Sequence, residues 1–305
     1  MLTCANRNLP SGHACMNPEA LSGAASIALL STIVFLLLAK SCQAIARFIG
    51  STSRFPASIM HEPAQRFRDE MDRLTRRLHV YLTSALVFVV VFAVSYFLRP
   101  GALFSTLPTW QLAIILAVLS VVSLYEAYRF VTVLLARRRA AFLRDANIAA
   151  GHGLQKLTAN RNRIFHDVPC GTGIIDNVIV GSHGIYAVNI VARRTRKDNT
   201  VRLTGDTLEF APGNYSLPLS AFAQRAQQLA RELRKVLKHD VRVRSVIAVP
   251  GWEIDSQSSD EHLIVNERNL AMLRGWKDQN DYLLNEEVEK LQKLLAARCM
   301  RFGKK

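Results

Sequence analysis

The sequence has few of the residue patterns that mark common catalytic or metal centres. Its five cysteines show no metal-ligand spacing. The histidines His152, His166 and His183 do not form a His-x-x-x-His pair. Gly171–Gly173 lacks the lysine of a phosphate-binding loop, and there is no serine nucleophile elbow or Cys/His pair. These absences argue against zinc-dependent, P-loop and Ser/Cys nucleophile chemistry.

Internal repeats and low-complexity segments are also absent, whereas apolar residues are abundant. Half of the 305 residues are hydrophobic, and the mean hydropathy is +0.11. Three apolar segments account for the excess, at about residues 21–40, 78–98 and 112–134. Each is long enough to cross the roughly 30 Å of a bilayer core. The first could instead be a signal peptide, but about twenty mostly uncharged residues precede it, so we expect an anchor.

Positive charge is distributed unevenly around these segments. The connection between the second and third segments has only Arg99, whereas Arg137–Arg139 and Arg144 follow the third. The connection between the first and second carries Lys40, Arg47, Arg54, Arg66, Arg68, Arg73, Arg76 and Arg77. Because basic residues mark the cytoplasmic side, we predict an integral protein of the bacterial inner-membrane type, with its N-terminus outside and its C-terminal part cytoplasmic.

The expected organisation follows from this topology. Residues 1–20 form an extracytoplasmic tail, 21–136 a transmembrane region with a cytoplasmic loop at 41–77, 137–270 a globular domain, and 271–305 a helical extension. Cys4 and Cys15 lie in the tail and could pair in an oxidising compartment, although isolated thiols are the first expectation.

A helix is predicted in the cytoplasmic loop, from Glu62 towards Leu78, continuing into the second segment. Phe67, Met71 and Leu74 recur at helical spacing on it, beside basic residues. This stripe suits the lipid headgroup layer, with contact to the cytoplasmic domain as the alternative.

A β-hairpin is predicted between Ile175 and Val191, because two apolar runs flank a Gly-Ser-His-Gly turn. Asp176 lies at the start of the first strand. Asn189 and Val191 lie on the second strand and project from the same face, since side chains alternate. Read without any family likeness, Asp176 is a strand-opening residue that caps a turn.

The hairpin resembles that of the nuclease-related domain (NERD), a branch of the PD-(D/E)xK restriction-endonuclease-like superfamily. That pattern has Ile-Asp, a glycine turn, and Glu-x-Lys. The likeness covers roughly residues 145–270, with a helix at 146–159, a Gly205-Asp206 hairpin, a helix opening at Pro218 and Gln224, and a late strand at 243–250. It implies an α/β restriction-endonuclease-like domain with a central mixed β-sheet flanked by helices, which follows the three N-terminal transmembrane helices predicted from the apolar segments.

The resemblance also implies that Asp176 binds a divalent cation such as Mg²⁺. Asn189 and Val191 replace the Glu and Lys of the motif, which removes a negative charge and a donor. Binding of Mg²⁺ is therefore expected to be weak or absent, and the catalytic motif to be degenerate. Groups that could have migrated to restore it are Lys156, Arg193, Lys197 and Glu209.

Basic side chains follow the hairpin at Arg193, Arg194, Arg196 and Lys197, a possible phosphate-binding loop. A solvated loop is the alternative. Residues Arg225, Arg231, Arg234 and Lys235 could extend the same surface. The net charge of +15 decides nothing by itself, because many of the cations are topogenic and attract anionic lipids.

Three functions remain open from the sequence. The first is a membrane-anchored NERD-like protein that binds or processes DNA or RNA with a degenerate motif. The second is an active metal-dependent nuclease with relocated ligands. The third is a membrane scaffold whose cytoplasmic face docks a protein partner and ignores nucleic acid.

Overall fold

The structure, a computed structural model, describes residues 18–49, 60–97, 109–156, 162–194, 199–213, 215–255, 261–274 and 282–300. The chain divides into two compact units. The first comprises Met1–Ile49 with Thr75–Leu134, and the second Gly50–Leu74 with Leu135–Lys305.

Long helices make up the first unit. They are α1 (Pro18–Ile49), most of α2 (Gln65–Phe97) and the first part of α4 (Thr109–Gln155). Two of them, over Gln65–Ser95 and Ala117–Gln155, are long and apolar enough to cross a membrane. Only 11% and 6% of their most apolar stretches are buried inside the structure. The first predicted segment falls in α1, whose described apolar stretch, Ile27–Cys42, is shorter.

Both apolar helices continue beyond the predicted spans. Helix α2 begins at Gln65 and runs unbroken through the predicted loop helix, as the sequence suggested. Helix α4 has no proline and no glycine before Gly151, so nothing interrupts it until that point. The helix predicted at 146–159 is confirmed as far as Gln155, where it forms the end of α4.

The second unit is built on a five-stranded mixed sheet in the order β1-β2-β3-β7-β9. The strands are β1 (Arg163–Cys170), β2 (Gly173–Gly181), β3 (Gly184–Ile190), β7 (Val243–Ala248) and β9 (His262–Val265). The first three pair antiparallel, and β3, β7 and β9 pair parallel. The predicted hairpin, the late strand and the mixed sheet are confirmed.

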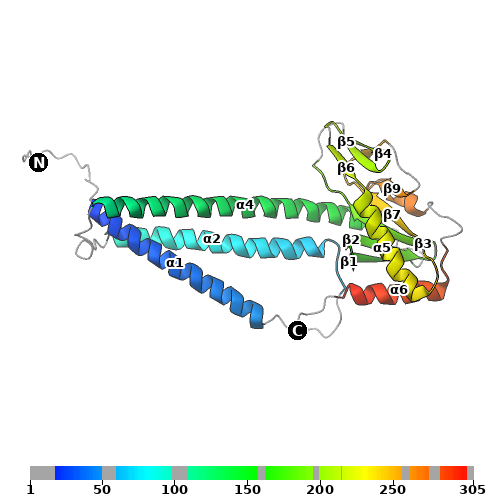
Figure 1. The fold of residues 1–305 in the computed structure, drawn as a ribbon, viewed down its shortest axis with the longest axis horizontal. Coiled ribbons are helices and arrows are strands. Elements are labelled where there is room, and N and C mark those ends of the chain that lie inside the picture. The colour runs from blue at the N-terminus through cyan, green and yellow to red at the C-terminus, as the bar shows by residue number, and fades with distance from the viewer. Residues whose placement is uncertain are drawn as a thin grey trace, which may run out of the picture. The chain divides into compact units, whose positions relative to one another are not determined.

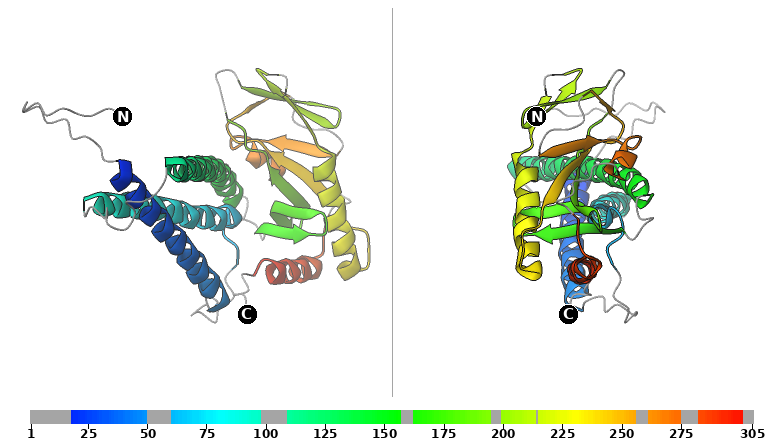
Figure 2. Two further views of the ribbon diagram at one scale, coloured as in Figure 1. Left: turned by 60° about the vertical axis from the view of Figure 1, so that its left-hand side comes forward. Right: turned by 90° about the vertical axis from the view of Figure 1, so that its right-hand side faces the viewer.

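Helices cover both faces of this sheet (Figure 1). On one face lie α5 (Ser220–Leu237) and α6 (Asn285–Arg298), whose buried Leu229, Leu233, Leu291 and Leu295 pack in one apolar cluster with sheet residues. The end of α4 and the 3₁₀ helix η1 (Leu270–Arg274) supply Ala150, Leu154, Leu270 and Leu273 to a second cluster. Figure 2 shows α5 and η1 on opposite sides of the sheet. Each fully buried leucine contributes roughly 1.5–3 kcal/mol.

A second, four-stranded sheet, which the sequence did not predict, has the order β6-β5-β4-β8. Its strands are β4 (Thr200–Thr204), β5 (Thr207–Ala211), β6 (Tyr215–Pro218) and β8 (Glu253–Ile254). The predicted hairpin at Gly205-Asp206 joins β4 to β5, and Gly205 has a φ of 59°, which favours glycine. Val201, Phe210 and Trp252 bury its inner face in a third cluster.

Candidate functional site

The β2–β3 hairpin positions the residues of the predicted motif. Its strands pair from Gly181 and Gly184 at the turn to Asn177 and Val188. The pairing ends there, and the next residues along the two strands are Asp176 and Asn189.

Asp176 is almost enclosed, with 10% of its side chain exposed. Its Oδ1 accepts a hydrogen bond from Nη2 of Arg66 at 3.1 Å, and its Oδ2 accepts one from the backbone N–H of Ile190 at 2.8 Å. Burial raises the pKa of the Asp176 carboxyl, against the opposing effects of the Ile190 hydrogen bond and the Arg66 charge. The pKa is raised overall, so the Ile190 hydrogen bond and the Arg66 charge do not fully offset the cost of removing the carboxylate from water.

A second carboxylate, Asp167 on β1, approaches the same arginine. Asp167 is 6% exposed and has a φ of 49°, so the strand departs from regular alternation there. Its Oδ2 accepts a hydrogen bond from the backbone N–H of Arg66 at 3.1 Å, in the first turn of α2. A carboxylate there satisfies a free helix N–H and complements the helix dipole. Arg66 thus contacts one acid through its backbone and another through its guanidinium.

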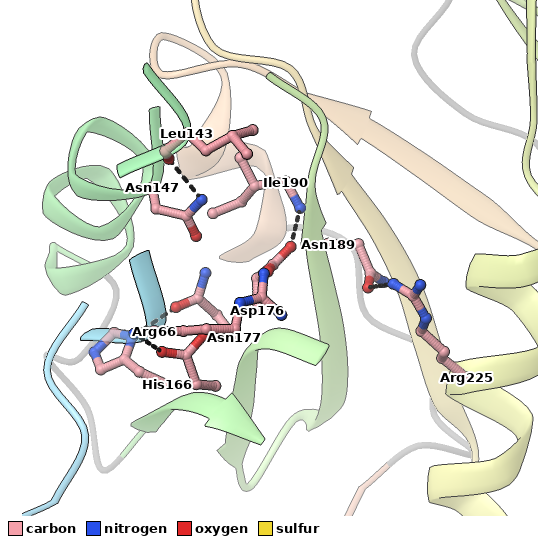
Figure 3. Close-up of polar contacts among 10 residues, drawn as sticks. Arg66, Leu143, Asn147, His166, Asp176, Asn177, Asn189, Ile190 and Arg225 are labelled. Atoms are coloured by element: carbon pink, nitrogen blue, oxygen red, sulfur yellow. Dashed lines mark hydrogen bonds and ion pairs between the residues drawn. The ribbon is translucent and has the colours of Figure 1, made fainter. Parts of the chain in front are cut away.

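Asn189 takes a different partner, Arg225 of α5. Its Oδ1 accepts a hydrogen bond from Nη1 of Arg225 at 3.3 Å. The side chain is fully buried, and its Nδ2 has no hydrogen-bond partner among the residues that the structure describes. Figure 3 shows Asn189 turned towards Arg225, whereas Asp176 lies beside Ile190 and Arg66. The two motif positions therefore engage separate arginines.

Val191, the third motif position, is part of an apolar environment. Its backbone N–H donates to the carbonyl of Ala248 at 2.9 Å. Its side chain packs against the cluster that contains Ile247, which is the register partner of Asn189 on β7. No polar donor is offered from this position.

These side chains do not fit a divalent cation. Mg²⁺ requires several oxygen ligands in near-octahedral geometry, but Asp176 is held by Arg66 and the one Asn189 oxygen by Arg225. Within the described residues, no group of three His, Cys, Asp or Glu side chains is placed to hold a metal.

The sequence also suggested residues that could have migrated to this site. Glu209 and Lys156 are exposed, Lys197 lies outside the described residues, and Arg193 contacts the second sheet. The cation beside Asp176 is Arg66, one of the basic residues that were predicted to mark the cytoplasmic side of the membrane.

The predicted phosphate loop is described only at Arg193 and Arg194, since Arg196 and Lys197 lie outside the described residues. The guanidinium of Arg193 stacks over the ring of Tyr215 at 3.9 Å and lies 5.3 Å from the centroid of Phe210. Its carbonyl accepts a hydrogen bond from the indole N–H of Trp252 at 3.1 Å. Arg193 therefore ties the segment after β3 to the second sheet, and Arg194 is exposed.

Helix α5 presents a basic outer face, which we call the α5 basic face: Arg231, Arg234, Lys235 and Lys238 are all exposed. Glu232 lies between them in the sequence but is half-buried, and it accepts hydrogen bonds from Arg298 and the N–H of Gly171. Burial opposes ionisation of Glu232, but the hydrogen bonds from Gly171, Arg298 and Gln228 together lower its pKa. The acid is thus used for packing α5 against α6 and β1, and the outward charge is positive.

The family comparison covers the hairpin, the end of α4 and α5. Residues 145–250 match the nuclease-related domain, NERD. The family predicted from the hairpin is confirmed for this segment. The NERD match leaves out α1, α2, Arg66, β9, η1 and α6.

Comparisons beyond the family give little more. A solved structure of SfsA from Pyrococcus furiosus in complex with Ca²⁺ is similar to the chain at 15% identity and a TM-score of 0.22. The likeness covers 53% of this chain and 54% of SfsA, so the chain spans about half the length of that protein. No curated protein matches the chain.

Proposed function

We propose that this chain is a membrane-anchored NERD protein whose domain binds nucleic acid without metal-dependent cleavage. The observation that carries the proposal is the pairing of Asp176, the motif's remaining acid, with the Arg66 guanidinium. Because Asn189 and Val191 add neither charge nor a free oxygen ligand, the cation that would activate water has no coordination shell. Mg²⁺ is accordingly weakly bound or not bound at this site.

The α5 basic face supports binding to phosphate. Arg231 and Lys235 lie four residues apart on α5, so they project from one side of the helix, and the exposed Lys238 follows as its C-cap residue. Exposed cations on a rigid helix release counterions when they meet a nucleic-acid backbone, which makes binding favourable and dependent on salt. DNA or RNA is the partner that this surface fits under the proposal, with the backbone read in place of the bases.

The proposed membrane arrangement keeps the predicted one. Three spans, at about 21–40, 78–98 and 112–134, place the tail outside and the loop and NERD domain in the cytoplasm. The two long apolar helices support the second and third spans. The domain limits 137–270 and 271–305 are proposed with them, and the bilayer is the first partner of the chain.

Binding is tested with the full chain in nanodiscs of zwitterionic lipid, so that anionic headgroups do not compete. Fluorescence anisotropy is measured with labelled single-stranded DNA, duplex DNA and RNA across a salt series. The variant Arg231→Glu/Lys235→Glu reverses two charges on α5. The matched control, Lys290→Glu/Lys293→Glu, makes the same charge change at exposed positions of α6.

We expect the α5 variant to weaken binding by about tenfold to a hundredfold and to lower the salt slope by about two. The α6 variant should change both much less. Absence of salt-sensitive retention in the wild-type chain contradicts nucleic-acid binding and favours the protein-docking scaffold. Equal losses in both variants contradict the assignment to α5.

A further inference from the structure

We infer that residues 60–66 form an intramolecular strap that closes the motif site, with the Arg66 guanidinium as its resident cation in place of a metal ion. The strap comes from outside the segment that matches NERD. It belongs to the same compact unit as the five-stranded sheet. The remaining motif acid is therefore a docking point for the chain's own membrane-proximal segment.

The strap is attached at its start to the C-terminal end of the chain. Met60 forms a β-bridge with Met300. The backbone N–H of His61 donates to the carbonyl of Cys299 at 3.0 Å. The Cys299 side chain is only 1% exposed. These contacts place the beginning of the strap beside α6.

The middle of the strap packs closely on the end of α4. A Cβ at Gly151 would lie 3.1 Å from Cβ of Pro63, so the absence of a side chain there permits the approach. Ala64 is 4% exposed and has a φ of 61°. A non-glycine residue in this conformation is strained, and it persists where surrounding contacts fix it.

The strap ends on the two acids, where helix α2 begins. Asp167 accepts the Arg66 backbone N–H, and Asp176 accepts the Arg66 guanidinium, both at 3.1 Å. A divalent cation at Asp176 would have to displace a guanidinium that is already held at a second point. The Arg66 guanidinium is covalently part of the chain and needs no set of oxygen ligands. This agrees with the replacement of the motif's Glu and Lys by Asn189 and Val191.

The inference shares one premise with the proposed function: both leave the motif site without a metal ion. It is tested by a separate readout, the opening of the strap, which needs no nucleic acid. Failure of DNA or RNA binding leaves the strap intact, and failure of the strap leaves the α5 basic face intact.

Cys299 is a reporter next to the strap: its backbone carbonyl accepts the His61 N–H, and its side chain is buried in the apolar cluster of α5, α6 and the sheet. Burial, the main cause, raises the pKa of its thiol to about 11, so labelling by a maleimide requires local opening. The full chain is treated with N-ethylmaleimide under native conditions, and each cysteine is quantified by peptide mass spectrometry. Cys170, on β1 and half-buried, is the internal reference for unfolding of the sheet.

We expect Arg66→Gln to label Cys299 about tenfold faster than the wild type, as loss of one charge-assisted contact predicts. Labelling of Cys170 should stay unchanged. The matched control is Arg73→Gln, which removes an exposed arginine of α2 that pairs with Glu70 outside the strap. It should leave the Cys299 rate unchanged. Arg66→Lys keeps the charge and should give an intermediate rate.

Any one of four results overturns the inference. The first is an unchanged Cys299 rate in Arg66→Gln, and the second is an equal increase in Arg73→Gln. The third is an effect of Mn²⁺ at about 1 mM that speeds Cys299 labelling in the wild type but not in Asp176→Asn, because it would show a metal displacing Arg66 at this carboxylate. Acceleration of Cys170 together with Cys299 in Arg66→Gln but not in Arg66→Lys would show loss of the sheet and also contradict a local strap.

Discussion

Replacing Arg66 by methionine removes the counter-charge of Asp176 while keeping an unbranched side chain. A hydrogen bond between charged groups contributes about 1.5–3 kcal/mol, and removing one partner of a fully buried pair costs about 3–5 kcal/mol. The Arg66 side chain is 38% exposed and that of Asp176 10%. We therefore expect Arg66→Met to lower the free energy of unfolding by about 2 kcal/mol at neutral pH.

Asp176→Asn behaves differently, because it removes the buried charge but keeps an oxygen that can accept the Ile190 N–H. Burial already disfavours the ionised carboxyl, so this variant should cost no more than about 1 kcal/mol. In the Asp176→Asn background, Arg66→Met no longer removes an ion pair. The coupling energy of the cycle is expected to be about 1–2 kcal/mol.

The pH dependence provides a second check. The pKa of Asp176 is raised in the folded protein, so the folded state binds a proton more tightly than the unfolded state. Its burial cost is thus absent at acid pH and appears as pH rises above the unfolded value of about 3.9 and through the raised pKa. Without Arg66 that pKa rises further. The penalty of Arg66→Met should therefore shrink on acidification, as Asp176 becomes neutral in both proteins.

The assay is urea unfolding of the full chain in detergent, followed by tryptophan fluorescence, to which the buried Trp252 of the second unit contributes. Four proteins are compared at neutral and acid pH: the wild type, the two single variants and the double variant. A coupling energy below about 0.3 kcal/mol, or a penalty that does not depend on pH, refutes the account of Arg66 as the counter-ion of Asp176.

Three further substitutions have defined expectations. Glu232→Gln should lower stability by about 1–2 kcal/mol at neutral pH, as measured by urea unfolding. Because the pKa of Glu232 is lowered in the fold, this loss should disappear as pH falls below about 4. A loss that persists in acid contradicts the role of its charge. Gly151→Leu should displace Pro63 and speed labelling of Cys299 without any change of charge; an unchanged rate means that the strap does not depend on this contact. Val191→Lys restores the cation of the NERD motif. It should lower the free energy of unfolding by about 1–3 kcal/mol, because the Val191 side chain packs against the third apolar cluster. No loss of stability in thermal unfolding would show that the lysine ammonium reaches solvent.

The hairpin and helices were predictable because local signals determine them. A glycine turn between two apolar runs gave β2 and β3, and Pro218 preceded α5 as expected. The second sheet was missed because its strands β6 and β8 are only four and two residues long. Such short strands have no periodicity that a sequence pattern can show.

The partners of the site could not be predicted. Arg66 is separated from Asp167 by 101 residues and from Asp176 by 110, and it stood among eight basic residues that membrane topology already explained. The irregular backbone at Asp167 also has no sequence signature. Arg193 was assigned to a solvated or phosphate-binding loop, because its ring partners Phe210 and Tyr215 lie on later strands.

Hydrolysis by the full chain is the most direct test of the claim that Asp176 is paired with Arg66 and holds no catalytic metal. Labelled DNA and RNA are incubated with the wild-type protein and with Asp176→Ala in Mg²⁺ or Mn²⁺, and released fragments are quantified. We predict no cleavage by the wild type above the level of Asp176→Ala. Cleavage that requires the divalent cation and disappears in Asp176→Ala would contradict the claim and establish an active nuclease.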